Sequence, residues 1–255
     1  MALTLYHGEP AANSLKVLLG IKEKGVPFES KLMNLHKFEQ HEPWFQAINP
    51  MGQVPVLIHD GMVINESTVI NEYLDEAFDG PALRPADPYG RAKMRIWTKF
   101  VDEYFCPALS FIGWHHMIKN ITDKLTPEEF EEKLARIPLK EQQDKWRTSA
   151  KQGYTQEQLD NWGRQVKTSV ERMEKQLART EWLVGDQFTL ADVSCYAMAY
   201  AMPTRSPQLL ADKPGVTRWH KAMSEREGTK AAMAMPNPVR ETLEAARAGI
   251  SSTLR

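Results

Sequence analysis

The chain has 255 residues, of which 42% are hydrophobic and 25% are charged, a composition typical of soluble globular proteins. Its formal net charge of −1 provides no basic surface for a nucleic-acid backbone. No apolar run reaches the length of a membrane-spanning helix, and residues 1–10 lack the features of a secretory signal. We therefore expect a cytoplasmic protein with no nucleic-acid partner and no membrane partner.

The two cysteines, Cys106 and Cys195, lie far apart in the sequence. Their spacing matches neither a thiolate metal site nor a redox pair, so no metal is predicted. A disulfide between them would add little to a chain of this length. We expect each cysteine to be a small hydrophobic residue of the core.

The first 80 or so residues alternate between strand and helix patterns. Asn13 and Ser14 open an amphipathic helix that Gly25 ends. Asp60 and Gly61 separate two apolar runs, which is a strong signal of a β-hairpin. The predicted elements are a strand at 3–7, a helix at 13–24, a strand at 28–34, two hairpin strands within 53–67 and a helix from 67 to about 78. The order βαβ followed by ββα predicts an α/β unit of thioredoxin-like type.

The pattern changes after the segment GPALRPADP (80–88), which is rich in proline and small residues. Helical periodicity then replaces the strands, most clearly at 155–179, where apolar residues recur at spacings of three and four. The other predicted helices lie at 90–118 with a kink at Pro107, in a charged insertion at 127–148, at 190–202, at 215–227 and in a tail from 238. We predict a thioredoxin-like domain at 1–82, a linker at 83–88 and an all-helical domain at 89–255.

Asn13 and Ser14 place two small polar side chains at the first turn of the first helix. Residues of this type cap helices well, which is a sufficient structural reason for them. A helix N-terminus also favours a bound anion. The residues alone leave both interpretations open.

Two further segments have both a structural and a functional interpretation. Pro55 begins a strand, and a cis bond before it would turn the main chain of Val54 outward to pair with a peptide-like ligand. Ser67 begins a helix and can bind a carboxylate, while Glu66 can accept from an ammonium group. In the structural interpretation, Pro55 ends a loop, Ser67 caps its helix and Glu66 is a surface acid favoured by the helix dipole.

The segment FTLADVS (188–194) predicts the start of a helix. Thr189 and Asp192 have the spacing of a capping box, with aspartate in place of the usual glutamate or glutamine. We interpret this segment as structural.

Taken together, Ser14 in a helix-opening loop, NPMGQVP (49–55), ESTVINEYL (66–74) and FTLADVS resemble the cytosolic glutathione transferase superfamily along the whole chain. The resemblance implies an N-terminal domain that binds glutathione as a co-substrate. It also implies a helical domain that supplies the pocket for a second substrate, and a homodimer.

The same resemblance implies which residues contact glutathione. Val54 is expected to pair with the cysteinyl main chain, and Glu66 and Ser67 to hold the γ-glutamyl end. Gln53 and His41 lie where related transferases contact the tripeptide main chain and the glycyl carboxylate. Glu42 stands where some relatives have a lysine, which weakens the prediction for the glycyl end.

Ser14, with Asn13 beside it, is the predicted activator of the glutathione thiol. An ordinary thiol has a pKa of about 8.5, so little of it is thiolate near neutral pH. A helix N-terminus and a donated hydrogen bond both favour the charged form. Tyr6 on the first strand is the competing candidate, because some transferases use a tyrosine there. No cysteine occupies this loop, which argues against redox members of the superfamily.

A closer resemblance is to bacterial glutathione-dependent β-etherases of lignin degradation, carried by ANSLK (12–16), KFEQHEPWF (37–45) and RIWTKFVDEYF (95–105). It implies attack of the thiolate on the carbon that carries an aryloxy group beside an aryl ketone. A phenol is released and a glutathione thioether forms. The alternatives are a general glutathione transferase, a lyase acting on other aromatic electrophiles, or a non-catalytic binder of aromatic ligands.

Five residues lie in segments that the resemblance places near the second-substrate pocket: Trp114, His115, His116, Met117 and Trp146. Adjacent histidines on a helix are commonly one core and one surface residue, so neither is assigned a catalytic role. The two tryptophans and Met117 are interpreted as packing residues.

Overall fold

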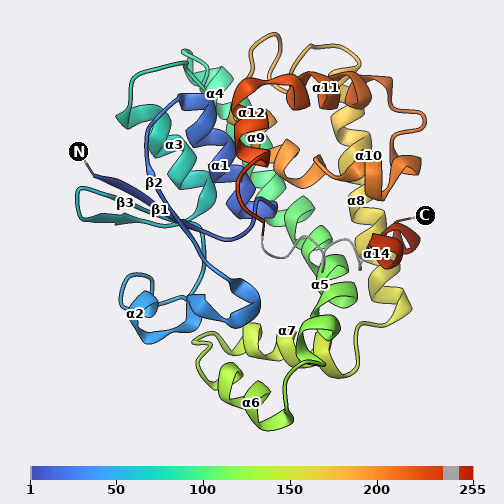
Figure 1. Cartoon of the computed structure of the whole chain (residues 1–255). Helices are drawn as coiled ribbons and strands as arrows, with labels where there is room; N and C mark the ends of the chain where they lie inside the picture. Colours follow the sequence, from blue (N-terminus) through green and yellow to red (C-terminus); the bar gives the residue numbers. More distant parts are fainter. Residues whose placement is uncertain (1, 238–246, 255) are drawn as a thin grey trace.

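The computed structural model describes residues 2–237 and 247–254, and it has the predicted α/β part followed by helices (Figure 1). The sheet has the strand order β2-β1-β3-β4, with β1 parallel to β2 and antiparallel to β3. Helices α1 and α3 lie on one side of it and α2 on the other (Figure 1). These elements are β1 (Leu3–His7), α1 (Ala12–Lys24), β2 (Glu29–Leu32), α2 (Pro43–Gln46), β3 (Val56–His59), β4 (Met62–Ile64) and α3 (Ser67–Ala77). The thioredoxin-like prediction is confirmed.

The residues that were predicted to form turns and helix ends have the backbone conformations that these features require. Asp60 and Gly61 join β3 to β4 with φ values of 47° and 85°, the positive values that a tight hairpin turn needs. Gly25 has a φ of 73°, and its N–H group donates to carbonyls of the last turn of α1.

Beyond α3 the described elements are helices. Helix α4 (Pro88–Phe100) leads into a π-helical segment (Val101–Phe105) and then into α5 (Cys106–Thr122). The irregularity predicted at Pro107 thus precedes the proline, which sits in the first turn of α5, where its missing N–H group is not needed. The other helices are α6 (Pro127–Ala135), α7 (Lys140–Lys151), α8 (Gln156–Leu177), α9 (Leu190–Ala199), α10 (Met202–Arg205), α11 (Pro214–Glu225), α12 (Glu227–Met233) and α14 (Arg247–Thr253).

Two sequence predictions concern segment boundaries. Of the helix expected from 238, residues 238–246 lie outside the described residues, and α14 begins at Arg247. The division into domains at 1–82 and 89–255 stays a prediction. Among the described residues, no helix is both long and apolar enough to span a membrane.

One hydrophobic core joins the sheet to the helices. It contains Leu5 and Leu57 of the central strands together with Val170 and Trp219 of the helical part. Helix α1 lies between the two parts, packed against α3 on one side and against α9 and α12 on the other. The first turn of α1 is therefore held in place by both halves of the chain.

The capping box at the start of α9 is confirmed. The Asp192 carboxylate accepts from the N–H group of Thr189 at 2.9 Å, from that of Leu183 at 3.0 Å and from the Trp219 indole at 2.9 Å. Burial nevertheless raises the pKa of Asp192 to about 6. Cys195, on the same helix, is buried as predicted.

Candidate active site

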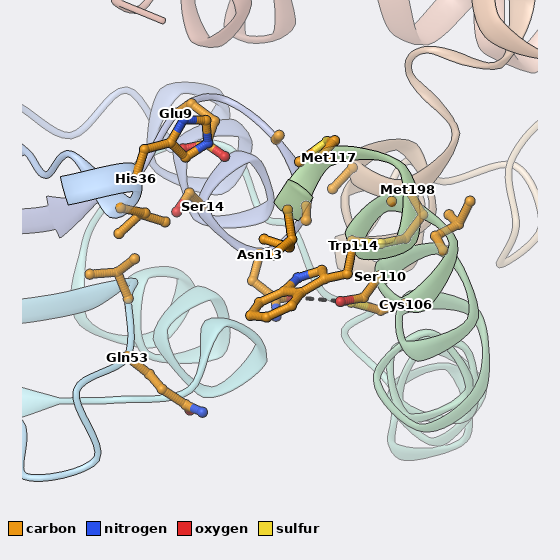
Figure 2. Close-up of a pocket in the computed structure, with 18 of the residues that line it drawn as sticks. Glu9, Asn13, Ser14, His36, Gln53, Cys106, Ser110, Trp114, Met117 and Met198 are labelled. Carbon is orange, nitrogen blue, oxygen red and sulfur yellow. Dashed lines mark hydrogen bonds between the residues drawn. The ribbon is translucent and has the colours of Figure 1, made fainter. Parts of the chain in front are cut away.

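A cavity of about 460 Å³ lies between the first turn of α1 and one face of α5 (Figure 2). This volume is typical of a pocket for a small-molecule ligand. The two sides of the cavity differ in chemistry. The polar side includes Glu9, Asn13, Ser14, His41, Gln53 and Val54, and the apolar side includes Cys106, Trp114, Met117, Trp146 and Met198.

The first turn of α1 begins one residue earlier than predicted. Its N-cap residue is Ala11, and no side chain caps the helix. Asn13 and Ser14 therefore lie inside the helix, so of the two interpretations left open for them, capping is not the one that the structure shows. Because the N–H groups of an uncapped first turn have no intrahelical acceptor, this end of α1 can bind an anion.

The side chains of Ser14 and Asn13 both have a donor to spare. Ser14 is buried, and its Oγ accepts the N–H group of Gly8 at 3.0 Å, which leaves its own hydrogen to be donated. The Asn13 Oδ1 atom accepts the hydroxyl of Ser67 at 3.4 Å and lies 3.8 Å from the Cys106 sulfur. The Asn13 amide nitrogen remains available to a ligand.

The bond between Ser67 and Asn13 brings the start of α3 to the start of α1. No side chain caps α3 either, and its N-cap residue is Glu66, which has a positive φ of 67°. Ser67 is buried and Glu66 is exposed, and neither of them lines the cavity itself. Two uncapped helix N-termini thus lie close together at one edge of the cavity, where both helix dipoles favour a bound anion.

The loop before β3 provides main-chain groups. The Val54–Pro55 bond is cis, one of the two arrangements considered for Pro55. Val54 lines the cavity, and no hydrogen bond joins its main chain to another described residue. Gln53 lines the cavity beside it, with its carbonyl held by the Asn49 amide at 2.8 Å.

His41 lies in the wall of the cavity, where the sequence placed a glutathione contact. It is 5% exposed, and its Nδ1 atom has no hydrogen-bond partner among the described residues. Burial lowers the pKa of His41 to about 4, so the ring is neutral at physiological pH. Gly52 allows this approach, because a Cβ atom there would lie 2.5 Å from Nδ1.

Glu42, the departure from the family pattern, is paired within the chain. Its carboxylate accepts from Arg136, at the end of α6, at 2.8 Å. The carboxylate next to His41 is therefore partly neutralised from the helical part. A lysine at this position would face Arg136 instead, which gives the departure a physical reason.

Three of the five residues expected near the second-substrate pocket line the cavity, and the two histidines do not. Trp114, Met117 and Trp146 all line the cavity, and the two indole rings pack edge to face at 4.8 Å. His115 and His116 do not line it. His115 accepts the N–H group of Tyr154 at 3.1 Å, and His116 bonds Thr253 at 2.9 Å.

Tyr6, the competing candidate for thiol activation, does not line the cavity. Its ring packs against Trp44 and Phe45, with centroids at 6.0 and 5.5 Å. The alternation of side chains along β1 puts Tyr6 on the opposite face from Leu5 and His7. This geometry favours Ser14.

Sequence reasoning missed three charged residues that line the cavity: Glu9, Lys145 and Arg205. Glu9 stands beside the loop that was singled out, and burial raises the pKa of its carboxyl. Lys145 comes from α7, whose charged pattern indicates solvent-facing positions, and Arg205 is the last residue of the short helix α10. No local signal separates them from neighbouring surface charges.

The residues present fit the co-substrate that the resemblance implies. Glutathione is an extended tripeptide with carboxylates at its ends and a thiol in the middle. The cavity presents the uncapped N-terminus of α1, an unpaired main chain at Val54 and the neutral ring of His41, and the uncapped N-terminus of α3 lies beside it. These groups match a ligand of that charge and shape.

Comparison with known proteins agrees with this geometry. Residues 1–76 match the family model of the glutathione S-transferase N-terminal domain, and residues 127–227 match that of the C-terminal domain. The chain is 46% identical over 239 residues to Protein LigF of Sphingobium sp. strain SYK-6, covering 90% of this chain and 92% of the relative. The crystal structure of beta-etherase LigF from that strain has a TM-score of 0.87 at 45% identity, covering 91% of this chain and 98% of LigF.

The similarity extends to other organisms. Glutathione S-transferase F13 of Arabidopsis thaliana is 30% identical over 230 residues, covering 89% of this chain and 92% of the relative. A Burkholderia graminis glutathione transferase, solved with two glutathione molecules per subunit, is 23% identical. It shares the fold with a TM-score of 0.69, covering 93% of this chain and 89% of that one. The chain therefore belongs to the glutathione S-transferase family.

Proposed function

We propose that this chain is a glutathione-dependent β-etherase that cleaves β-aryl ether bonds in α-keto aromatic compounds of the kind derived from lignin. The observation that carries the proposal is a single cavity that combines an anion-binding edge with apolar, aromatic lining residues. The N-termini of α1 and α3 provide an anion site, and Trp114 of α5 and Trp146 of α7 line the same cavity. Figure 2 shows Trp114 on the α5 side, across from Ser14. The similarity to beta-etherase LigF over most of both chains supports the choice of reaction.

In this proposal the chain's own residues bind glutathione and prepare its sulfur. Val54 pairs with the cysteinyl main chain, Glu66 and Ser67 hold the γ-glutamyl end, and Gln53 and His41 contact the glycyl half. Ser14 and Asn13 donate hydrogen bonds to the sulfur at the positive end of α1, which lowers the pKa of the thiol.

Glutathione supplies a thiolate that displaces the aryloxy group from the carbon beside the ketone, so a C–S bond forms as the C–O bond breaks. Trp114, Met117 and Trp146 hold the aromatic rings of the ether and exclude water. The products are a phenol and a glutathione thioether, and the protein is not covalently modified.

The test is incubation with reduced glutathione and an α-keto β-aryl ether, each enantiomer separately. We expect equal amounts of phenol and thioether from at least one enantiomer. Turnover of a chloronitrobenzene without release of phenol from either ether would identify a general transferase instead. Glutathione binding without either reaction would identify a non-catalytic binder.

We also propose a cytoplasmic homodimer. Both cysteines are free thiols, in agreement with a reducing compartment. Exposed apolar side chains gather on neighbouring elements, namely Met62 and Val63 on β4, Val69 on α3 and Ile96 on α4. A second copy covering this surface would double the 29.1 kDa mass of the chain in sedimentation, whereas a monomer would contradict the proposal.

A further inference from the structure

The wall of the cavity contains a lysine that the reaction described so far does not use. Lys145 reaches from α7 to α5, where its Nζ atom donates to the Ser110 hydroxyl at 3.1 Å. The ammonium group lies 4.2 Å from the ring centroid of Trp114 and 4.4 Å from that of Phe111. No carboxylate among the described residues forms an ion pair with it.

Lys145 contacts one face of α5, and the residues on this face relate Lys145 to the proposed position of the glutathione sulfur beside Asn13 and Ser14. Cys106, at the start of this face, lies 3.8 Å from Asn13, a predicted sulfur ligand. Ser110, which binds Lys145, is one helical turn further along, a rise of about 6 Å. Figure 2 shows Cys106, Ser110 and Trp114 on the α5 side of the cavity, facing Asn13 and Ser14.

A displacement reaction needs positive charge at two places. The negative charge leaves the sulfur, on the α1 side, and develops on the ether oxygen at the far side of the attacked carbon. A hydrogen-bond donor aimed at that oxygen stabilises the transition state more than the ground state. Lys145 lines the same cavity and binds Ser110 of α5, the helix that faces Ser14 across it (Figure 2), so its ammonium group is available to the departing aryloxy group.

We propose that Lys145 is the general acid for the leaving group, a role that rests on the proposed β-etherase reaction. The sulfur lone pair forms the C–S bond, and the electron pair of the C–O bond moves to the aryloxy oxygen. That oxygen takes a proton from the Lys145 ammonium group, giving a neutral phenol and a neutral amine. The amine regains its proton from water after the phenol departs. Ser110 orients the ammonium group and stays protonated.

The electrostatics of the site agree with this role. Burial lowers the pKa of Lys145 to about 8, below the value of about 10 of a simple phenol such as tyrosine. The proton therefore moves downhill to an aryloxide. From α5 the Cys106 thiol is the titratable group that acts on Lys145. From α6, Glu131 is paired with Arg147 and Lys151 instead.

A purely structural role is the competing interpretation, since the two aromatic rings already stabilise the cation. The first experiment compares Lys145→Met and Lys145→Arg on ethers whose leaving phenols differ in acidity. Lys140→Met, an exposed change on the same helix, is the control. With an alkyl- or methoxyphenol, we expect Lys145→Met to lower kcat about 100-fold. With a nitrophenol, which needs no proton, the loss should stay below about 3-fold.

Lys145→Arg separates charge from proton donation, because a guanidinium group stays protonated in proteins. On ethers of alkyl- or methoxyphenols, Lys145→Arg should therefore show the same decrease in kcat as Lys145→Met. Wild-type kcat on these ethers should decline above the Lys145 pKa of about 8, and Lys145→Arg should lack this decline. An equal loss on all leaving groups in Lys145→Met, or full activity in Lys145→Arg, would overturn the proposal.

The second experiment needs no turnover, so its failure is separate from failure of the proposed function. The absorbance of 4-nitrophenol bound to the protein is titrated with pH. A cation at the aryloxide site should lower the pKa of bound nitrophenol in the wild type, in Lys145→Arg and in Lys140→Met. The pKa should return to the free value or above in Lys145→Met. The same pKa in wild type and Lys145→Met would place Lys145 away from the aryloxide and overturn the proposal.

Discussion

At the scale of single residues, the account depends on the spare hydroxyl hydrogen of Ser14. A hydrogen bond to a charged acceptor contributes about 1.5 to 3 kcal/mol, so Ser14→Ala should lower kcat/KM by about 10- to 100-fold. Asn13→Ala should give a smaller loss in the same direction. Initial rates of phenol release at several glutathione concentrations measure both effects.

Tyr6→Phe is the matched control for this prediction, because it removes a hydroxyl outside the cavity. We expect its turnover to stay within about 3-fold of the wild type. If Tyr6→Phe abolished turnover while Ser14→Ala and Asn13→Ala together left it unchanged, the activating residues would be misassigned.

His41 gives a prediction for stability against pH in the absence of glutathione. Burial lowers its pKa from 6.5 to about 4, so below pH 6.5 the unfolded chain binds a proton that the folded chain does not. The contribution of about 3 kcal/mol to the unfolding free energy is complete above pH 6.5 and lost as pH falls to about 4. His41→Asn should therefore lose less stability than the wild type between pH 7 and 4.5 in urea unfolding.

Asp192 acts in the opposite direction over nearly the same range. Burial raises its pKa from 3.8 to about 6, so its contribution falls as pH rises through this interval. In His41→Asn the contribution of His41 is absent, so the pH dependence of the unfolding free energy that comes from Asp192 should become visible. Identical losses in the variant and the wild type would show that the His41 ring is solvated or paired in solution.

The candidate site could be predicted only in part from single residues. Ser14, His41 and Val54 were found because family motifs mark them, and all three line the cavity. Glu66 and Ser67 belong to the same motifs but lie beside the cavity, joined to it through Asn13. Lys145 was missed, because its neighbours in α7 are charged and only the packing of α7 on α5 turns it inward.

At the scale of elements, α14 closes one end of the cavity. Ile250 and Leu254 line it, and the helix is held by the bond from His116 to Thr253 at 2.9 Å. Leu254→Ala removes apolar contact worth about 1 to 2 kcal/mol. The KM for the aryl ether should rise about 5- to 30-fold, while the KM for glutathione stays the same.

Thr253→Val is the companion variant, since it removes the anchoring bond and keeps the apolar residues in the sequence. It should shift the KM for the ether in the same direction by a smaller factor. An equal rise in both KM values would mean that α14 supports the whole cavity rather than the second-substrate end.

Elements with strong local signals could be predicted well. The Asp60–Gly61 hairpin, the Gly25 helix end and the Thr189–Asp192 capping box are fixed by short-range backbone chemistry. The start of α1 was predicted less well, because Ala11 has no capping side chain to mark it. The π-helical segment Val101–Phe105 has no simple sequence signature, and the contact of its Asp102 with Lys16 of α1 joins residues far apart in the sequence.

At the scale of the whole molecule, an ion pair between a buried lysine and a partly exposed aspartate joins the two parts of the chain. Lys16 of α1 is fully buried, and its ammonium group binds Asp102 of the π-helical segment and Thr68 of α3. Asp102→Ala leaves the buried ammonium group with its hydrogen bond to Thr68 but without a carboxylate, which should lower the unfolding free energy by about 1.5 to 3 kcal/mol.

Glu103→Ala is the control, because Glu103 is the next residue and its ion pair among the described residues is with exposed Lys99. It should change the unfolding free energy by less than about 0.5 kcal/mol. Urea unfolding should show one transition for both variants, since a single core spans the α/β and helical parts. A change of less than about 0.5 kcal/mol in Asp102→Ala would mean that this ion pair contributes little to the contact between the α/β part and the helical part.

The central claim is that the N-terminus of α1 binds the glutathione sulfur as a thiolate. The most direct measurement is an ultraviolet absorbance titration of the thiolate in the protein–glutathione complex, for the wild type and for Ser14→Ala. We predict a thiol pKa clearly below the ordinary value of about 8.5 in the wild type and a return toward it in the variant. A wild-type complex whose thiol titrates as it does in free solution would contradict the account.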